Sequence, residues 1–378
     1  MQRIYMDANA TTPVLAAVVD AMLPFWAADF GNASAVYANG RGARGAIDTA
    51  REHVAHLLSA KPAEITFTSG GTESDNLALF GILHPGDHLI TSAIEHDAVL
   101  HAADALQANG IAVTCVGCNA DGVVSAAAVA AAMRPQTRLV SIMLANNETG
   151  VLQPLSAIAL AAHAGGALLH TDAVQACGKI PVDVHALGCD LLSLSAHKMH
   201  GPQGVGALWA RPGITVRPML FGGGQERRRR AGTENVAGIA GMGTAAALTV
   251  QWLASGSQAH LALLRDTFVT GLRTRIDGIT VNGEAAARLP NTASLQFAGV
   301  DAEALVIALD LRGLAISGGS ACQSGAIEPS HVLVAMALSA AAARSSVRFS
   351  LSRTTTPDEV AAAIDIVTAA VDRLRSIR

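Results

Sequence analysis

A lysine stands where a buried strand is predicted to end. Lys198 lies in SAHKMHGPQG (residues 195–204), directly after an apolar, slightly alternating run and just ahead of a Gly-Pro turn. Such a run indicates a strand, and the Gly-Pro pair indicates the loop that follows it. Lysine is scarce in this chain. Lys198 is therefore either a solvated turn residue or an amine placed to form a Schiff base with a carbonyl compound.

Other polar groups also follow predicted strands. In TSGGTESDN (residues 68–76), Ser-Gly-Gly-Thr leads into a helix N-terminus. Backbone N–H groups and the helix dipole favour a phosphate there, although the same residues also make an ordinary helix cap. Asp172, in HTDAVQ (residues 170–175), ends another strand. Its carboxylate would be costly to bury without a cationic partner.

An amine, a carboxylate and a phosphate cup in one chain match the needs of pyridoxal 5'-phosphate. Lys198 would form the Schiff base, and Asp172 would pair with the pyridinium nitrogen. His96, in AIEHDAV (residues 93–99), follows a further strand and would lie over the ring. A neutral structural histidine is the alternative at that position. The combination is more specific than any of its members.

Composition restricts the class of protein. The 378 residues are 51% hydrophobic and only 15% charged, with a formal net charge of -4. These values predict a large core and no general nucleic-acid surface, and the low charge hints at an oligomer. The N-terminus lacks a charged segment followed by an apolar one, and no uninterrupted apolar run reaches about 18 residues. We therefore expect a soluble cytoplasmic protein.

Five cysteines argue against a disulfide framework. They are Cys115, Cys118, Cys177, Cys189 and Cys322. An odd number in a long chain without a signal peptide favours free thiols. The lone C-x-x-C at Cys115 and Cys118 has no further ligands at zinc-site spacing nearby. We expect these two cysteines to be structural and predict no metal.

The elements that must position these residues alternate from about residue 60 onward. Predicted strands at 64–68, 88–94, 111–117, 137–144, 167–174, 191–197 and 205–211 are interleaved with predicted helices at 71–83, 97–110, 125–133 and 155–166. This alternation predicts an α/β fold with a mostly parallel sheet covered by helices. Ligands of such sheets bind beyond the carboxyl ends of the strands.

The pattern changes after about residue 250. A helical stretch at 260–276 precedes short strands at 280–283 and 292–299, and a last helix opens at Thr356 and Pro357. We therefore predict a large domain of residues 13–253. A smaller α+β domain would contain residues 1–12 and 254–378.

Six motifs together resemble a known family. They are FTSGGTESDN, NNETG, HTDAVQ, SAHKMHGPQGVG, GGGQERRRRAGTEN and SGGSACQSGAIEPSHVL. With these motifs in order, the chain resembles a cysteine desulfurase of the NifS/IscS type. That group belongs to the class V aminotransferases among fold-type I pyridoxal-phosphate enzymes. The resemblance runs from YMDANATTP to VRFSLSRTTT, which is nearly the whole chain.

The resemblance implies a role for each matching residue. Lys198 would hold the cofactor covalently, and Asp172 would pair with the pyridine nitrogen. His96 would stack on the ring and transfer protons. The residues that would hold the other cofactor groups are Gln175 at the phenolate oxygen and Gly71, Thr72, Ser195, His197 and Thr233 at the phosphate. Thr233 would come from the partner subunit of a homodimer. Asn147, Arg348 and Asn32 would bind the substrate.

Cys322 is the residue that would make this enzyme a desulfurase. It lies in ISGGSACQSG, a Gly/Ser-rich stretch with little apolar content to pack, which predicts a mobile loop. The resemblance implies that its thiolate takes the sulfur of L-cysteine, leaving L-alanine and a persulfide on Cys322. The sulfur would then pass to an acceptor protein, such as an iron-sulfur scaffold, for cluster assembly or other thiolation.

Rival interpretations remain at this point. A selenocysteine lyase or an aminotransferase of the same family is the nearer alternative. Four arginines, Arg227 to Arg230, suggest RNA or an acidic partner. In a net acidic chain, a dimer-interface loop beside the phosphate explains them better, so we expect no direct nucleic-acid binding.

The chain departs from the family pattern at several positions. The family commonly has proline, serine and threonine where this chain has Ala33, Gly318 and Gln323. The chain also ends without the scaffold-docking tail of housekeeping relatives, which favours the NifS-like branch.

Overall fold

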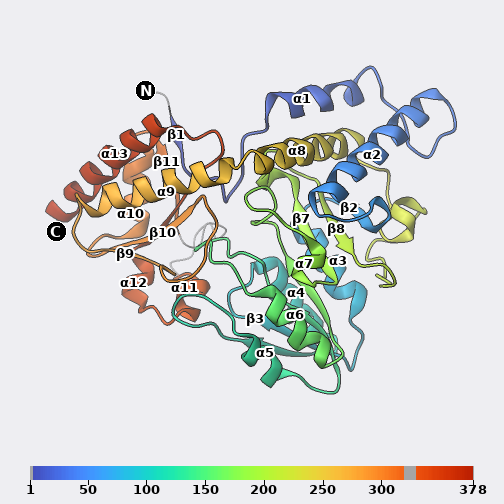
Figure 1. Cartoon of the computed structure of the whole chain (residues 1–378), viewed down its shortest axis with the longest axis horizontal. Helices are drawn as coiled ribbons and strands as arrows, with labels where there is room; N and C mark the ends of the chain where they lie inside the picture. Colours follow the sequence, from blue (N-terminus) through green and yellow to red (C-terminus); the bar gives the residue numbers. More distant parts are fainter. Residues whose placement is uncertain (1–2, 319–328, 378) are drawn as a thin grey trace.

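The computed structural model describes residues 3–318 and 329–377, so Cys322 and Gln323 lie outside the described residues. Figure 1 shows two lobes, with the large sheet in one and both chain ends at the other.

The large sheet is mostly parallel, as the alternating pattern predicts. Within the described part of the chain it has seven strands in the order β2-β8-β7-β6-β5-β3-β4. Neighbours are parallel except at β8, which runs antiparallel to β2 and β7. The strands are β2 (Ile65–Thr68), β3 (His88–Ser92), β4 (Ala112–Val116), β5 (Thr137–Ser141), β6 (Leu168–Asp172), β7 (Leu191–Ser195) and β8 (Gly206–Ala210).

Helices cover both faces of this sheet. One face packs on α3 (Gly71–Ile82) and α4 (Asp97–Ala108) through an apolar cluster that includes Leu79 and Leu89. The other face packs on a larger cluster that includes Ile90 and Leu192. Its helices are α2 (Ala38–Leu57), α5 (Ala126–Ala132), α6 (Leu155–Ala164), α7 (Val184–Leu187) and α8 (Val236–Ala254). Successive strand residues thus enter opposite cores, which explains why most residues of β2, β3, β5, β6, β7 and β8 are buried.

Helix α8 is long and apolar enough to cross a membrane by length and composition alone. The expectation from uninterrupted apolar runs did not anticipate this, because the helix contains scattered Thr and Gln residues. In the fold, α8 packs on α2 and on α1 (Ala16–Met22), and half of the apolar window is buried. A Cβ at Gly243 would come within 2.4 Å of the Ala50 Cα, so the two helices touch backbone to backbone. This close contact is typical of a core helix.

The second lobe has its own sheet and core. The antiparallel order is β12-β13-β10-β9, and β1 pairs with β11 beside it. The strands are β1 (Ile4–Tyr5), β9 (Ile279–Val281), β10 (Thr292–Phe297), β11 (Leu314–Ala315), β12 (Ser317–Gly318) and β13 (Ser346–Ser350). The helices are α9 (Ser257–Arg273), α10 (Ala302–Asp310), α11 (His331–Ala335), α12 (Ala340–Arg344) and α13 (Pro357–Ser376).

A separate apolar cluster fills this lobe and includes Met6 from the N-terminal segment and Phe268, Phe297 and Phe349. The domain boundaries at residues 13 and 253 stay a prediction. Helix α13 begins where the sequence predicts: the Thr356 hydroxyl accepts the Glu359 N–H, and the Glu359 carboxylate accepts the Thr356 N–H.

Candidate active site

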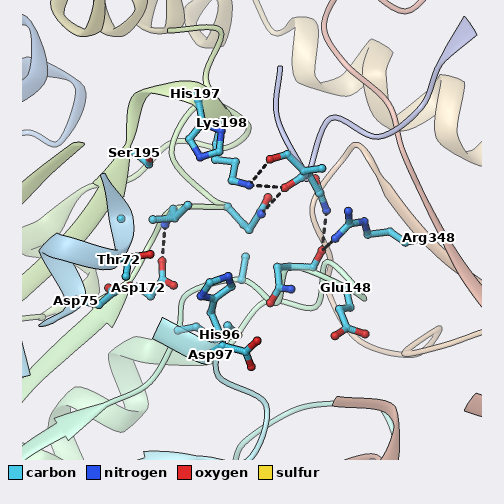
Figure 2. A pocket seen from close by; sticks show the side chains of 18 of the residues that line it. Thr72, Asp75, His96, Asp97, Glu148, Asp172, Ser195, His197, Lys198 and Arg348 are labelled. Carbon is cyan, nitrogen blue, oxygen red and sulfur yellow. Dashed lines mark hydrogen bonds between the residues drawn. The ribbon is translucent and has the colours of Figure 1, made fainter. Parts of the chain in front are cut away.

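Most of the predicted site residues meet at one cavity of about 340 Å³. It lies at the carboxyl ends of the parallel strands, where such sheets bind ligands. The predicted residues that line it are Gly71, Thr72, His96, Asn147, Asp172, Gln175, Ser195, His197, Lys198 and Arg348. Figure 2 shows Lys198, Asp172, His96 and Arg348 reaching it from different elements.

Lys198 reaches the cavity from a short turn after β7. The strand ends at Ser195, and one 3-10 turn, η3 (Ala196–Lys198), follows it. The Lys198 Nζ donates hydrogen bonds to the carbonyl oxygens of Asn9 and Ala10, both at 2.7 Å (Figure 2). The amine therefore lies inside the protein rather than in a solvated turn. Gly201 permits this turn, since a Cβ there would lie within 2.9 Å of the Ala196 carbonyl oxygen.

Asp172 supplies a buried carboxylate at the end of β6. Its side chain is only 7% exposed, and one oxygen accepts the Val174 N–H at 2.8 Å. Burial raises the pKa of Asp172, while the charges of His96 and Lys198 oppose the rise. A cationic ring nitrogen beside this carboxylate would offset the cost of its burial.

A second carboxyl group, Asp75 of α3, lies in the cavity wall. Burial and the nearby Asp172 charge raise the pKa of Asp75 well above its usual value, which favours the neutral acid. Its Oδ1 has no hydrogen-bond partner within the described residues and lies 3.7 Å from the His170 Nε2. Burial lowers the pKa of His170 to about 3, so this imidazole is neutral at physiological pH.

His96 caps helix α4 with its ring. The His96 Nδ1 accepts the Ala98 N–H at 3.1 Å. A neutral ring with this acceptor carries its proton on Nε2. The cap thus fixes which ring nitrogen can donate a proton in the cavity.

The start of α3 forms an anion cradle. Gly71 is its first residue, and a Cβ there would lie 2.7 Å from the Val174 Cγ2, so a larger residue would have to displace that side chain. Ser195 and His197 line the same cavity. Burial, then the charge of Lys198, lowers the pKa of His197 to about 4. The first backbone N–H groups of a helix have no partner within it, so the start of this 12-residue helix suits a phosphate.

Arg348 brings a cation from the other lobe. It lies on β13 and donates to the Asn147 carbonyl at 2.9 Å and to the Asp7 carboxylate at 2.7 Å. The Arg348 Nε and the Asn147 Oδ1 are both buried without a hydrogen-bond partner in the described residues. One orphaned donor and one orphaned acceptor would suit a ligand that carries a carboxylate and an N–H group.

Sequence reasoning missed several cavity residues. Asn9, Glu148 and His331 line the cavity without having been singled out, although all three lie in quoted motifs. Burial raises the pKa of Glu148 to about 7, and the Ser330 hydroxyl donates to its carboxylate at 2.5 Å. The His331 Nε2 lies 2.9 Å from the Glu95 carbonyl oxygen. Their polar side chains inside the quoted motifs were the available signal.

Two predicted residues, Thr233 and Asn32, do not line the cavity of the single chain. Cys322 lies outside the described residues. Thr233 and Asn32 are both exposed. Arg44 links their segments, since it donates to the Ala33 carbonyl and pairs with Glu234, each at 3.3 Å. The two segments therefore lie on one surface, and neither Thr233 nor Asn32 lines the cavity of its own chain.

At least one arginine of the run Arg227 to Arg230 forms an ion pair within the chain. Arg230 pairs with Glu73 of α3 at 2.9 Å. Next to the run, buried Glu226 accepts two hydrogen bonds from Arg51. Residues 226–228 have positive φ angles of 43°, 56° and 65°. This ion pair offsets the cost of three consecutive left-handed residues.

The cysteines in the described part of the chain do not form a metal site. No cluster of three or more metal-ligating side chains occurs among the described residues. Cys115 is exposed, Cys118 is partly buried, and Cys177 and Cys189 are buried, all as free thiols.

These residues fit pyridoxal phosphate. The cavity offers an amine, a carboxylate for a cationic ring nitrogen, an imidazole at its wall and a helix N-terminus for a phosphate. The glycine cradle and the orphaned polar atoms are observations independent of the motifs. The residues that would hold the group are Lys198, Asp172, His96, Gln175, Gly71, Thr72, Ser195 and His197.

Known proteins match this chain over nearly its whole length. Residues 4–362 match the family model described as aminotransferase class-V. The chain is 44% identical to a cysteine desulfurase from Cereibacter sphaeroides, across 100% of this chain and 98% of that protein. A solved NifS-like protein superposes with a TM-score of 0.92 at 35% identity, covering 99% of this chain and 100% of that one.

A further solved structure, SspA in complex with cysteine, has a TM-score of 0.81 and 36% identity, covering 92% of this chain and 98% of that one. The fold predicted from the motifs thus occurs in proteins of one kind. The chain belongs to the cysteine desulfurases within the class V aminotransferase family, which are pyridoxal-phosphate enzymes.

Proposed function

We propose that this chain removes sulfur from L-cysteine, releases L-alanine and carries the sulfur as a persulfide on Cys322. The observation that carries the proposal is the convergence of Lys198, Asp172, His96 and Arg348 on one cavity. Each would supply a group that the reaction of an amino acid with pyridoxal phosphate requires. The cysteine bound by the related SspA structure supports the substrate class.

The proposed proton steps use Lys198 and His96. When bound, pyridoxal phosphate withdraws electrons from the substrate carbon and so stabilises negative charge there. Lys198 would hold the cofactor covalently and, once released by the substrate amine, would take the α-proton at its Nζ. His96 would donate from Nε2, because its Nδ1 is occupied by the Ala98 N–H.

Arg348 and Asn147 would orient the substrate. The Arg348 guanidinium would bind the carboxylate, while the orphaned Asn147 Oδ1 would accept a hydrogen bond from an N–H group. Arg348 is already positioned by the Asn147 carbonyl and the Asp7 carboxylate. The cation therefore needs little rearrangement on binding, which favours catalysis.

The proposed sulfur step balances with one cysteine and one enzyme thiol. The Cys322 thiolate attacks the substrate sulfur, so an S–S bond forms and the substrate C–S bond breaks. The electron pair of the broken bond stays on carbon, which takes up a proton to become the methyl group of alanine. The persulfide sulfur then passes to an acceptor thiol, such as that of an iron-sulfur scaffold protein.

A direct assay tests this proposal. Purified protein with L-cysteine and dithiothreitol should release alanine and sulfide in a 1:1 ratio. A selenocysteine lyase would turn over selenocysteine and leave cysteine unchanged. An aminotransferase would instead convert cysteine only when a 2-oxo acid is added. Either of those results would replace the desulfurase proposal.

The proposed assembly is a homodimer with shared sites. Thr233 and Asn32 are exposed and linked through Arg44, which supports a surface that completes the partner's cavity. The cytoplasm is the proposed location, and we expect neither a membrane nor a direct nucleic-acid partner.

Mixing two defective variants tests the shared site. Lys198→Ala lacks the amine, and Thr233→Asp would place a carboxylate against the cofactor phosphate. Each variant alone should be nearly inactive. A mixed dimer contains one site with both native residues. Equal mixing with free exchange makes about half of the dimers mixed, so about a quarter of wild-type activity should return. The two variants kept unmixed are the control. If mixing restores nothing although mass spectrometry detects the mixed dimer, Thr233 does not act in the partner's site.

A further inference from the structure

A second lysine is buried behind the cavity. Lys179 lies four residues after Gln175 and is only 5% exposed. Its Nζ donates to the Gln175 Oε1 at 2.5 Å and to the Asn9 Oδ1 at 2.9 Å. Both acceptors are side-chain amides, and no carboxylate within the described residues forms an ion pair with Lys179. Such a buried lysine is unusual and needs an explanation.

Lys179 decides which way two amides face. A side-chain amide has an oxygen that accepts and a nitrogen that donates, whereas a lysine ammonium only donates. The Gln175 Oε1 must therefore face Lys179, and its Nε2 points away and donates to the Asn9 carbonyl at 2.9 Å. The Nε2 has a second N–H, and Gln175 lines the cavity. The amide can thus offer a donor to a ligand.

Asn9 is held by the same lysine. Its Oδ1 accepts from Lys179 and from the Asn291 Nδ2 at 3.0 Å. Its Nδ2 donates to the Asn147 carbonyl and to the Thr292 hydroxyl. The Asn9 backbone carbonyl accepts from both Gln175 and Lys198. One residue therefore connects the buried lysine, the amide and the amine.

The two hydrogen bonds that Lys179 donates do not require a charged amine. Burial and the charges of Lys198 and Arg348 lower the pKa of Lys179 well below its usual value, while the Cys177 thiol opposes this. A neutral amine still has two N–H groups, which suffice for two acceptor oxygens. The turn that brings Lys179 back needs Gly178, where a Cβ would lie 2.5 Å from the Met199 Cβ.

We infer that Lys179 is a positioning residue that turns the Gln175 amide so that an N–H, and not the carbonyl oxygen, faces the anionic ring oxygen of bound pyridoxal phosphate. The inference rests on the proposed function, since it requires that cofactor. A donor at this oxygen stabilises its negative charge, so losing the donor disfavours the less protonated form of the bound cofactor.

A double-mutant cycle tests this inference. The readout is the pH midpoint of the visible absorbance of the bound cofactor, measured for wild type, Lys179→Met, Gln175→Leu and the double variant. Each single variant should raise the midpoint by about one pH unit, and the double variant should show no further rise. Lys61→Met removes an exposed lysine and should leave the midpoint unchanged.

Each other outcome decides against the inference. If Lys179→Met raises the midpoint equally with and without Gln175, the lysine acts through its charge and the inference is wrong. An unchanged midpoint in Lys179→Met also overturns it. If that variant does not fold, Lys179→Gln provides the test. Its amide keeps a polar group at this position but can either donate to Gln175 or accept from it, so the midpoint should rise only in part. A wild-type protein without visible cofactor absorbance would overturn the proposed function itself, which is a distinguishable failure.

Discussion

Lys198→Ala should lose the covalent cofactor bond and lower desulfurase turnover by about 10³-fold or more. The physical reason is that one amine would both hold the cofactor covalently and accept the substrate α-proton. Lys198 lines the cavity, and its Nζ donates to the carbonyls of Asn9 and Ala10. Borohydride reduction of wild-type protein followed by peptide mapping should label residue 198.

Two other lysines serve as controls for that label. Lys61 is exposed, and Lys179 is buried against two amide oxygens. Neither should carry the reduced cofactor, and Lys61→Ala should keep both the colour and the turnover. A label on either residue, or a covalent cofactor in Lys198→Ala, contradicts the assignment.

Cys322→Ala should separate cofactor chemistry from sulfur transfer. The variant should bind the cofactor and still change its spectrum when L-cysteine is added, because those steps need only Lys198 and the cavity. Sulfide release under reducing conditions should fall by about 10³-fold or more, since only the attack on the substrate sulfur needs the thiolate. After treatment with cysteine, mass spectrometry of wild-type protein should find one added sulfur on the peptide that contains Cys322.

The four remaining cysteines are poor candidates for this thiolate. Partial desolvation raises the pKa of Cys115, although the residue is exposed, and that of Cys118, while burial raises the pKa of Cys189 to about 12. Burial raises the pKa of Cys177 as well. A raised pKa keeps a thiol protonated and unreactive at neutral pH. Cys115→Ala is therefore the matched control and should desulfurate normally. Normal turnover in Cys322→Ala, or added sulfur on Cys115 or Cys118, would reject the persulfide step.

Local patterns were sufficient for the large sheet and for many of the site residues. Strands such as β6 and β7 are almost wholly buried, begin with a pair of leucines and end at polar residues. Asp172 ends β6 and Lys198 follows the end of β7 within one turn, and parallel strands bring their carboxyl ends to one edge. The cap of α13 was equally local, because Thr356 and Glu359 satisfy each other's backbone donors within one turn.

The long helices α2 and α8 were not predicted. Both contain glycine and alanine where the helices meet, and Gly243 touches the backbone of Ala50. A small residue chosen for close contact gives a weak apolar signal, so periodicity does not mark the buried face. Their positions depend on packing against each other.

The sequence by itself determined which residues end the strands and which motifs they form. Only the tertiary structure decided that the segment with Asn9 passes beneath Lys198 and that Lys179 faces Gln175. It also decided that Arg348 from the other lobe reaches Asn147. The reason is that local sequence governs a segment's own backbone hydrogen bonds and its buried face, whereas the partner of a buried side chain comes from a distant segment brought there by packing.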